Sequence, residues 1–497
     1  MTNSFNEGVI IPIVEAIKRY ADRPALCVNG SFYTYKQFGE SVSKIRSFIR
    51  QSIKDQFPIG VVDNADLETY ASILAIWLEG KCYVPLQPTW PIERNQVIIS
   101  QSKMRLCFDT SPKSRYNVEQ IINPHNIEKA EEMLQFENFS DDFWACVLFT
   151  SGSTGHPKGV RISRKGLGTA IQSFWKTGVT LTCSDRCLQC FDLSFVVSFQ
   201  CIFAPLQRGA CLFPIPTGEI KYAYIIKLID EHHLTFCQMV LSMLILIQPY
   251  MVKSHCKQIH TFIILGEPCP IDVMKVLLAQ LPHTCIIQYY GSTETTLHTF
   301  CYCPTKKNLV THNGFLTIGT IIPPNRMLIL GDDKEPVQLG EKGELCIGGD
   351  QVSPGYWDDD EQNSSSFFYR LIDGKRFRFF YTGDLCFQNT DGYVFICGRI
   401  NSMVKIQGNR IELMEIENVA RRYLNNINVV CLPVKREDHL TEISLLIESV
   451  EFPIEDLREY LYTKLPSYMV PHRIKFIRHF PHNSNGKIDR YALISFC

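Results

Sequence analysis

Short apolar runs alternate with longer amphipathic stretches over the first four-fifths of the chain, and this alternation limits the fold more than any other feature. The run 59–62 precedes a helical pattern over 67–78, and a second run follows at 83–86. The same order returns at 261–265, 271–281 and 285–288. Strands that alternate with helices pair in parallel, because each helix carries the chain back to the same edge of the sheet. The sequence therefore predicts an α/β fold with mostly parallel sheets covered by helices.

The last hundred residues have a different pattern. A polar joint at 398–401 is followed by expected strands and helices at 403–406, 412–423, 429–434, 442–447 and 454–465. This mixture is typical of a small α+β unit. We predict a large N-terminal domain over residues 1–398, a hinge at 399–401, and a small mobile C-terminal domain over 402–497.

The composition excludes several classes of function. The 497 residues carry 50 Lys and Arg against 51 Asp and Glu, a net charge of -1, which argues against a nucleic-acid or membrane-surface binder. The N-terminus lacks the apolar region of a secretory signal, and the most apolar stretch, 239–247, is too short to span a bilayer. The 20 cysteines stand mostly in apolar contexts, without paired zinc-type spacing. We expect a cytoplasmic protein with reduced thiols.

Residues 148–160, LFTSGSTGHPKGV, have the composition of a phosphate-binding loop. Hydroxyls, a lysine, and glycines that let amide groups approach an anion stand close together. These are Thr150, Ser151, Gly152, Ser153, Thr154, Gly155 and Lys158. A Walker A loop needs a glycine before its lysine and a hydroxyl after it, whereas Pro157 and Gly159 stand here. A nucleotide triphosphatase loop is therefore excluded, and from these residues alone a solvated Ser/Gly turn stays open.

Two further turns are expected beside this loop. Gly266-Glu267 and Tyr290-Gly291 each follow an apolar run, as the loop does. Ligands of parallel sheets bind beyond the carboxyl ends of the strands. The sequence therefore predicts that the loop and both turns line one crevice.

Further motifs follow in a fixed order along the chain. They are the segment 74–88, the loop above, FDLS at 191–194, YGSTETT at 290–296, GELCIGG at 343–349, YTGDL at 381–385, Gly398-Arg399 with Lys405 and Gly408, and NGKID at 485–489. Together they resemble the adenylate-forming enzyme superfamily, and within it the adenylation domains of nonribosomal peptide synthetases and the stand-alone D-alanine–carrier protein ligases. The resemblance covers essentially the whole chain. It implies that a carboxylate and ATP give an acyl-AMP and pyrophosphate, after which a thiol takes the acyl group.

The resemblance implies ATP and Mg²⁺ as cofactors. Glu294 would bind the metal, for which a carboxylate oxygen is suited, and Lys487 would balance the charge that develops between substrate carboxylate and α-phosphate. Tyr290 would flank adenine, while Asp384 and Arg399 would contact the ribose. Thr150 joins Lys487 and Glu294 as the third expected catalytic residue. The expected nucleotide-binding set also contains Ser151, Gly152, Ser153, Thr154, Gly155, Lys158, Gly266, Glu267, Gly291, Ser292 and Thr293.

Lys487 belongs to the small domain, so the resemblance implies that this domain closes for adenylation and rotates for thioester formation. Three residues depart from the family pattern. Asn401 replaces the usual hinge aspartate, Ser292 a proline and Met403 a glutamine. None of these changes removes a phosphate, magnesium or lysine contact, although Asn401 removes a charge from the hinge.

Asp192 stands where amino-acid-activating members place the carboxylate that pairs with the substrate α-ammonium, and a helix-capping aspartate is the alternative. The other pocket positions are Leu193, Val196, Gln238, Ile263, Leu265, Tyr289, Leu297 and His298. Leu265 and Tyr289 are bulky where members with large substrates often have Gly or Ala. This favours glycine, alanine or serine. Gln238 and His298 keep a short polar substrate, or the compact proline, open.

The acceptor is expected on another protein. Only ten residues follow Lys487, and Gly348-Gly349-Asp350 lacks the serine that would bear phosphopantetheine. We therefore expect a separate phosphopantetheinylated carrier protein, docking near Gly408. An acyl- or aryl-CoA ligase is one alternative, although it has no use for the charge of Asp192. A nucleotide-binding relative without catalysis is another, against which Lys487, Glu294 and Asp384 argue.

Overall fold

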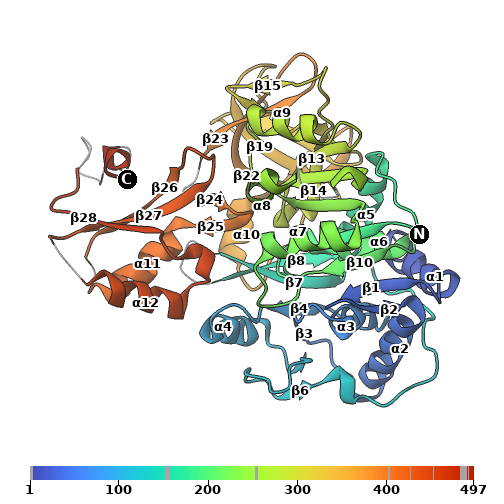
Figure 1. The fold of residues 1–497 in the computed structure, drawn as a ribbon. Helices are drawn as coiled ribbons and strands as arrows, with labels where there is room; N and C mark the ends of the chain where they lie inside the picture. The colour runs from blue at the N-terminus through green and yellow to red at the C-terminus, as the bar shows by residue number, and fades with distance from the viewer. Residues whose placement is uncertain are drawn as a thin grey trace.

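The computed structural model describes residues 4–151, 157–251, 256–400, 403–425, 427–450, 453–481, 488, 490 and 492–497. Two large sheets with helices lie side by side, a third sheet stands next to them, and the C-terminal unit projects to the left in Figure 1. Among the described residues, no helix is both long and apolar enough to cross a membrane.

One large sheet is formed mainly by the first third of the chain. In spatial order it contains β20 (Gly355–Tyr356), β8 (Lys158–Ser163), β7 (Trp144–Thr150), β4 (Tyr83–Leu86), β3 (Ile59–Val62), β5 (Leu106–Phe108) and β6 (Gln120–Ile122). Pairing is parallel from β7 to β6 and antiparallel at β8 and β20. The accompanying helices are α2 (Tyr35–Ser52), α3 (Leu67–Leu78), α4 (Ile92–Ser102) and α5 (Arg164–Lys176).

The second large sheet follows the same plan. In spatial order it contains β17 (Thr320–Ile321), β14 (Leu297–Tyr302), β13 (Cys285–Ser292), β12 (Thr261–Leu265), β11 (Phe236–Val240), β9 (Arg186–Gln189), β10 (Cys211–Pro214), β1 (Pro24–Val28) and β2 (Ser31–Thr34). Strands β13 to β1 pair in parallel, and both edges are antiparallel. Its helices are α1 (Ile11–Arg19), α6 (Ser198–Gln207), α7 (Lys221–His232), α8 (Leu241–Ile247) and α9 (Ile271–Gln280).

Burial explains why these strands could be predicted from the sequence. Every residue of β3 and β11 is buried, as expected for parallel strands with helices on both faces. Helix α3 is buried along its whole length, and the Asp66 side chain caps it by accepting a hydrogen bond from the Thr69 amide at 2.8 Å. The predicted α/β class with largely parallel, helix-covered sheets is confirmed.

One local prediction was wrong. Tyr290 and Gly291 were expected in a turn, but β13 continues to Ser292. The reason is antiparallel pairing with β14, which places Tyr290 opposite Phe300 and Gly291 opposite His298. A Cβ on Gly291 would stand 2.1 Å from the Leu297 carbonyl oxygen, so only glycine fits this crossing.

A third sheet is antiparallel and was not predicted. It contains β18 (Arg326–Leu330), β19 (Gly343–Gly348), β22 (Lys375–Gln388), β21 (Phe367–Ile372) and β23 (Val394–Arg399), with α10 (Asp360–Ser366) and the short strands β15 (Thr311–His312) and β16 (Phe315–Leu316) nearby in sequence. Strands β22 and β23 pair so that Asp384 stands opposite Arg399. The expected hinge at 399–401 thus begins on the last residue of a strand, and Asn401 lies outside the described residues.

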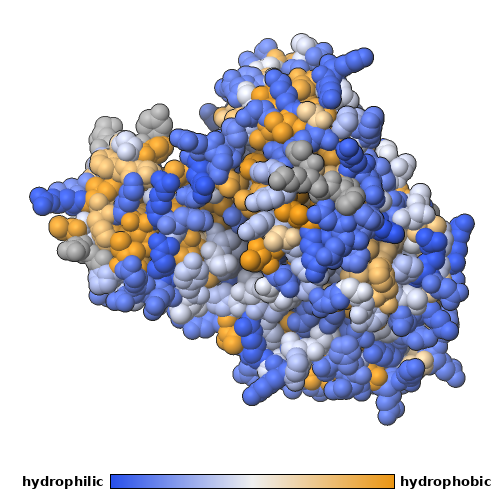
Figure 2. Space-filling view, in the orientation of Figure 1, coloured by the Kyte–Doolittle hydropathy of each residue, from blue (hydrophilic) through white to orange (hydrophobic). Residues whose placement is uncertain are grey.

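The C-terminal unit has its own apolar core, formed by residues after 403. It contains β24 (Met403–Ile406), β25 (Asn409–Glu412), α11 (Leu413–Tyr423), β26 (Val429–Lys435), β27 (Thr441–Glu448), α12 (Ile454–Lys464) and β28 (Arg473–Ile477). Figure 2 shows apolar side chains at the surface of this unit. Its exposed large apolar residues include Met414, Val450, Tyr462, Ile494 and Phe496.

Several polar contacts fasten the C-terminal unit to the rest of the chain. Arg94 on α4 and Glu415 on α11 form a buried ion pair of 2.6 Å. The Gly408 amide donates a hydrogen bond to Glu267 at 3.2 Å. Gly408 has a φ of 73°, and a Cβ there would stand 2.2 Å from Val240 Cγ1, so the approach requires glycine. These contacts bring the β24–β25 hairpin against the carboxyl ends of both large sheets.

Candidate active site

A cleft of about 1120 Å³ lies where both large sheets, the third sheet and the β24–β25 hairpin meet. Many of the predicted site residues line it: Thr150, Ser151, Val196, Leu265, Gly266, Tyr289, Tyr290, Gly291, Ser292, Thr293, Leu297, His298, Asp384 and Arg399. The predicted single crevice at the carboxyl ends of the strands is therefore present. Gly152, Ser153, Thr154, Gly155 and Lys487 lie outside the described residues.

At one end of the cleft, Asp384 is held by two neighbours. The Tyr290 hydroxyl donates to its Oδ2 at 2.5 Å, and Arg399 Nη1 donates to its Oδ1 at 2.7 Å. A second Arg399 nitrogen binds the Thr382 carbonyl at 3.0 Å. Burial, then the charge of Asp384, raises the pKa of Tyr290 well above its usual value, so this phenol stays a proton donor. The group presents a fixed carboxylate and an aromatic ring to the cleft.

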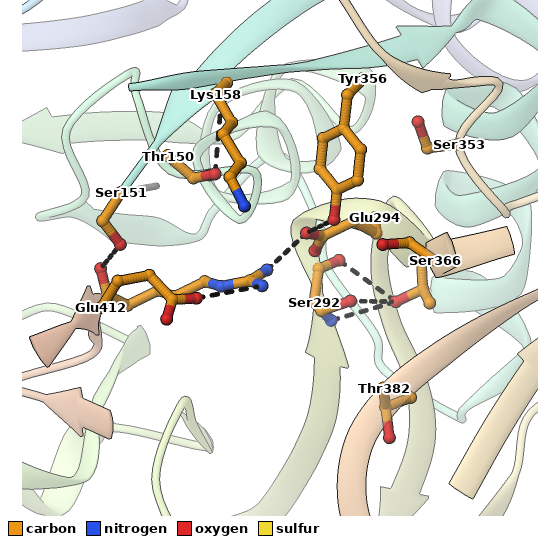
Figure 3. Close-up of polar contacts among 12 residues, drawn as sticks. Thr150, Ser151, Lys158, Ser292, Glu294, Ser353, Tyr356, Ser366, Thr382 and Glu412 are labelled. Atoms are coloured by element: carbon orange, nitrogen blue, oxygen red, sulfur yellow. Dashed lines mark hydrogen bonds and ion pairs between the residues drawn. The ribbon is translucent and has the colours of Figure 1, made fainter. Parts of the chain in front are cut away.

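Next to this group, the carboxylate of Glu294 is completely buried on the single turn Thr293–Thr295. Its Oε1 accepts a hydrogen bond from the Tyr356 hydroxyl at 2.8 Å (Figure 3) and a second one from Arg410 Nη1 at 2.5 Å. Burial would raise the pKa of Glu294, but the Arg410 charge and the Tyr356 hydroxyl hold it below its usual value. Glu294 Oε2 is buried and has no hydrogen-bond partner among the residues that the structure describes.

The described part of the phosphate-binding loop adjoins Glu294. The Thr150 hydroxyl donates to the Lys158 carbonyl at 3.5 Å, and the Ser151 hydroxyl donates to the Arg410 carbonyl at 2.6 Å (Figure 3). The Lys158 ammonium donates to Gln362 at 3.0 Å and lies 5.9 Å from the centre of the Tyr356 ring. Burial lowers its pKa from the usual value. A lysine and two hydroxyls therefore lie near Glu294 (Figure 3), and such groups can bind an anion.

The predicted substrate pocket contains a stacked pair of rings. Tyr289 and His298 lie 3.8 Å apart between ring centres with an interplanar angle of 10°. The Tyr289 hydroxyl and the Thr177 hydroxyl are 2.6 Å apart, which anchors the phenol. Burial lowers the pKa of His298 to about 3, and within the described part of the chain neither of its ring nitrogens has a hydrogen-bond partner. A neutral imidazole therefore offers both a donor and an acceptor to the pocket.

Four predicted substrate residues do not line the cleft. Leu193 and Ile263 are fully buried in the core. Gln238 lies beneath the surface with its Oε1 bound by Gln200 Nε2 at 2.5 Å. Asp192 lines a separate, polar cavity, where its Oδ1 accepts a hydrogen bond from Lys221 Nζ at 2.6 Å. The role of Asp192 as the carboxylate that binds the substrate α-ammonium thus stays a prediction. In this arrangement its charge is already paired with Lys221.

Glu267 also has a different environment from the one expected for a nucleotide contact. It accepts hydrogen bonds from the Ser242 amide at 2.8 Å and from Gly408. It therefore joins the large part of the chain to the C-terminal unit. Its contact with a nucleotide stays a prediction.

Two residues at the site, Arg410 and Tyr356, were missed by the sequence analysis, and both bind Glu294. Lys405 was named in a motif without a role, and it lies 5.6 Å from the centre of the Tyr290 ring. Arg410 stands two residues after the motif residue Gly408, and this position could have identified it as a site residue. The local sequence around Tyr356 has no comparable feature. Their roles come from pairings between segments that are far apart in the chain.

Comparison with known proteins agrees with this geometry. Residues 13–357 match the family described as AMP-binding enzyme. The chain is 27% identical to Gramicidin S synthase 1 of Brevibacillus brevis, over 96% of this chain and 43% of that protein. It is 30% identical to Tyrocidine synthase 3 of Brevibacillus parabrevis, over 97% of this chain and 7% of that protein. The chain thus spans less than half the length of these curated relatives.

Solved structures share the fold. One is a Vibrio cholerae adenylation domain, AlmE, in complex with glycyl-adenosine-5'-phosphate; the TM-score is 0.86 at 22% identity, covering 100% of this chain and 98% of that one. Another is an artificially fused adenylation–PCP di-domain from Klebsiella oxytoca, with a TM-score of 0.83 at 22% identity over 94% and 93% of the two chains. Since the family match covers more than half of the sequence, the chain belongs to the AMP-binding enzyme family, within the adenylate-forming superfamily.

Proposed function

We propose that the chain activates a small amino acid as an aminoacyl-AMP, with ATP and release of pyrophosphate, and then passes the aminoacyl group to the phosphopantetheine thiol of a separate carrier protein. Glycine, alanine and serine are the favoured substrates, and proline is possible. The observation that carries the proposal is the cleft. Asp384 with its two partners and the Tyr289–His298 pair line one space, and Arg410, which binds the buried Glu294, lines it too. Similarity to the synthases and adenylation domains named above supports it.

In the first half-reaction, a carboxylate oxygen of the amino acid would attack the α-phosphorus of ATP. The bond to the bridging oxygen breaks, and its electron pair leaves on pyrophosphate. Asp384 has lone pairs left to accept hydrogen bonds from ribose hydroxyls. Lys158 and the hydroxyls of Thr150 and Ser151 would stabilise the negative charge of the leaving group. Lys487, outside the described residues, is proposed to approach the reacting oxygens.

The residues at Glu294 fit a magnesium ion. A buried carboxylate is the hard ligand that Mg²⁺ prefers, and one of its oxygens makes no hydrogen bond to any residue that the structure describes. When bound, Mg²⁺ would neutralise negative charge on the phosphates. In the arrangement described here, the Arg410 guanidinium provides a positive charge at the same carboxylate.

In the second half-reaction, the thiolate of phosphopantetheine would attack the acyl carbon, and the bond from this carbon to the AMP oxygen breaks with its electrons leaving on AMP. Met403, Lys405 and Gly408 of the β24–β25 hairpin line the cleft and would border the incoming arm. We propose that Lys487 replaces this hairpin during adenylation. Residues 399–401 would be the hinge between the bodies 1–398 and 402–497.

A pyrophosphate-exchange screen across the amino acids, with fatty and aryl acids beside them, tests the proposal. We expect ATP-dependent exchange with glycine, alanine or serine, and weak exchange with leucine or phenylalanine. Loading of a phosphopantetheinylated carrier protein is the second readout. Exchange with fatty or aryl acids alone would refute amino-acid activation.

One observation favours a second candidate, an acyl- or aryl-CoA ligase. The carboxylate of Asp192 is already paired with Lys221, so the site as arranged does not need an ammonium from the substrate. In this case coenzyme A would replace the carrier protein as acceptor. The same screen, with coenzyme A supplied, separates the two candidates.

A further inference from the structure

The segment 191–197 separates two cavities, and its two halves face different ones. Ser194, Phe195, Val196 and Val197 line the cleft. Phe191 and Asp192 line a second cavity with Lys221 from the start of α7. The substrate-binding segment is therefore contacted by charged groups from the side opposite the cleft.

Two of these groups bind the segment directly. Lys221 Nζ donates to Asp192 Oδ1 at 2.6 Å and to the Cys190 carbonyl at 3.3 Å. Asp63 Oδ2 accepts a hydrogen bond from the Leu193 amide at 2.7 Å. Burial, then repulsion from the Asp192 charge, raises the pKa of Asp63 to about 7. Burial alone would lower the pKa of Lys221, but Asp192 raises it above the usual value.

Lys221 is an unusual residue for its position. It is the first residue of α7, where the helix dipole disfavours a positive charge. The Asp192 carboxylate offsets this effect. The Lys221 side chain keeps 41% of its surface exposed, against 25% for Asp192. Lys221 can therefore regain water contacts when it leaves Asp192, whereas Asp192 would lose its counter-charge.

We propose that Lys221 is a specificity-determining residue: it pairs with Asp192 as an internal cation and holds this carboxylate away from the cleft, so Asp192 must leave Lys221 and turn towards the cleft to pair with the α-ammonium of the substrate. This inference rests on the proposed activation of an amino acid. The exchange replaces one ion pair by another, so the ammonium adds less to binding than it would at a free carboxylate. Lys221 therefore reduces the preference for an amino acid over the same acid without its amino group.

The test compares matched substrates in pyrophosphate exchange. The pairs are glycine with acetate, alanine with propionate, and serine with 3-hydroxypropionate, and the ratio of their kcat/KM values is measured. Lys221→Gln should raise this ratio at least about fivefold, mainly through a lower KM for the amino acid, because Asp192 then has only the substrate ammonium as a charged partner. Binding of the amino acid, measured by calorimetry, should also be tighter in Lys221→Gln than in wild type.

Three variants serve as controls. Lys221→Arg keeps the charge and should keep the ratio of wild type. Lys227→Gln removes a cation from the same helix, where it lies over Tyr224, and should change nothing. Asp192→Asn should bring the ratio towards one, and adding Lys221→Gln to it should have no further effect, because no carboxylate remains to compete for.

An unchanged or lower ratio in Lys221→Gln overturns the inference, as does an equal rise in Lys227→Gln. If Lys221→Gln does not fold, as judged by thermal unfolding, Lys221→Met has the same expected and contrary results. Failure of the proposed function is read from a different number: wild type would then prefer every amine-free acid to its amino acid. The two failures are thus distinguishable.

Discussion

Replacing Arg410 should alter how the protein binds the proposed magnesium ion. In the structure, Arg410 Nη1 is 2.5 Å from Glu294 Oε1, and Glu294 is fully buried while the Arg410 side chain is 25% exposed. Removing one partner of a buried pair costs about 3–5 kcal/mol. We expect about 2–3 kcal/mol here, since Arg410 is partly hydrated and Tyr356 still donates to the same oxygen. Arg410→Gln should therefore weaken the docking of the C-terminal unit against the cleft.

The same substitution should strengthen divalent binding. A metal that uses Glu294 must compete with the Arg410 guanidinium, so losing the guanidinium should lower the half-saturating Mg²⁺ concentration at least about tenfold, which corresponds to 1.4 kcal/mol. Mn²⁺ binding in the presence of ATP, followed by electron paramagnetic resonance, measures this without turnover. Transfer to the carrier thiol should slow in parallel, because the docked arrangement is less populated.

A matched variant controls for loss of an arginine in general. Arg421 pairs with Glu417 at 3.0 Å within the C-terminal unit. Arg421→Gln should leave the Mn²⁺ affinity unchanged, and Arg410→Lys should give an intermediate value. The reasoning fails if Arg410→Gln and Arg421→Gln bind Mn²⁺ with the same affinity as wild type.

Three other results are expected. Tyr289→Ala should admit leucine roughly tenfold better relative to glycine, at about 3 kcal/mol lower stability from lost stacking on His298, as measured by exchange kinetics and urea unfolding; an unchanged substrate ranking would contradict this. Lys487→Ala should abolish pyrophosphate exchange but spare transfer from supplied aminoacyl-AMP. Equal loss of both activities would refute the proposal that the small domain adopts a different arrangement in each half-reaction. Burial alone would raise the pKa of Asp185, but hydrogen bonds from His260 and Thr235 lower it to about 2. Because this folded-state pKa lies below the unfolded value, the stabilisation is present above about pH 4 and is lost as pH falls towards 2. Asp185→Asn should cost about 1–2 kcal/mol at pH 7 in urea unfolding, and this cost should become small as the pH falls through about 2.

The sequence predicted the parts of the fold in which burial is uniform. Strands such as β3 and β11 are buried on both faces and appear as short apolar runs. Strand β22 was not predicted, because KRFRFFYTGDLCFQ mixes cations with aromatics and more than half of its residues stay partly or fully exposed. Its identity as a strand depends on partners from β19, β21 and β23, which local pattern does not reveal.

For the site, the motifs predicted which residues meet at the cleft but not which of them bind one another. Thr150, Tyr290 and Asp384 could be placed because each belongs to a motif at the end of, or within, a strand. The pairing of Glu294 with Arg410 depends on how the C-terminal unit docks. The pairing of Asp192 with Lys221 depends on the direction in which the Asp192 side chain points. Neither of these properties follows from spacing along the chain.

These two ion pairs have a common physical origin. Glu294 and Asp192 are the carboxylates that the motifs assign to a metal and to an ammonium, and each is bound by a cation of the chain itself. A buried carboxylate without a counter-charge is costly, so a site made for a cationic ligand is stable only if the protein supplies a substitute. Each substitute is attached where it can leave: Arg410 on the C-terminal hairpin and Lys221 at a partly exposed helix end. If Glu294 and Asp192 bind the proposed metal and ammonium, binding of either ligand is an exchange, and its affinity is the difference between two ion pairs.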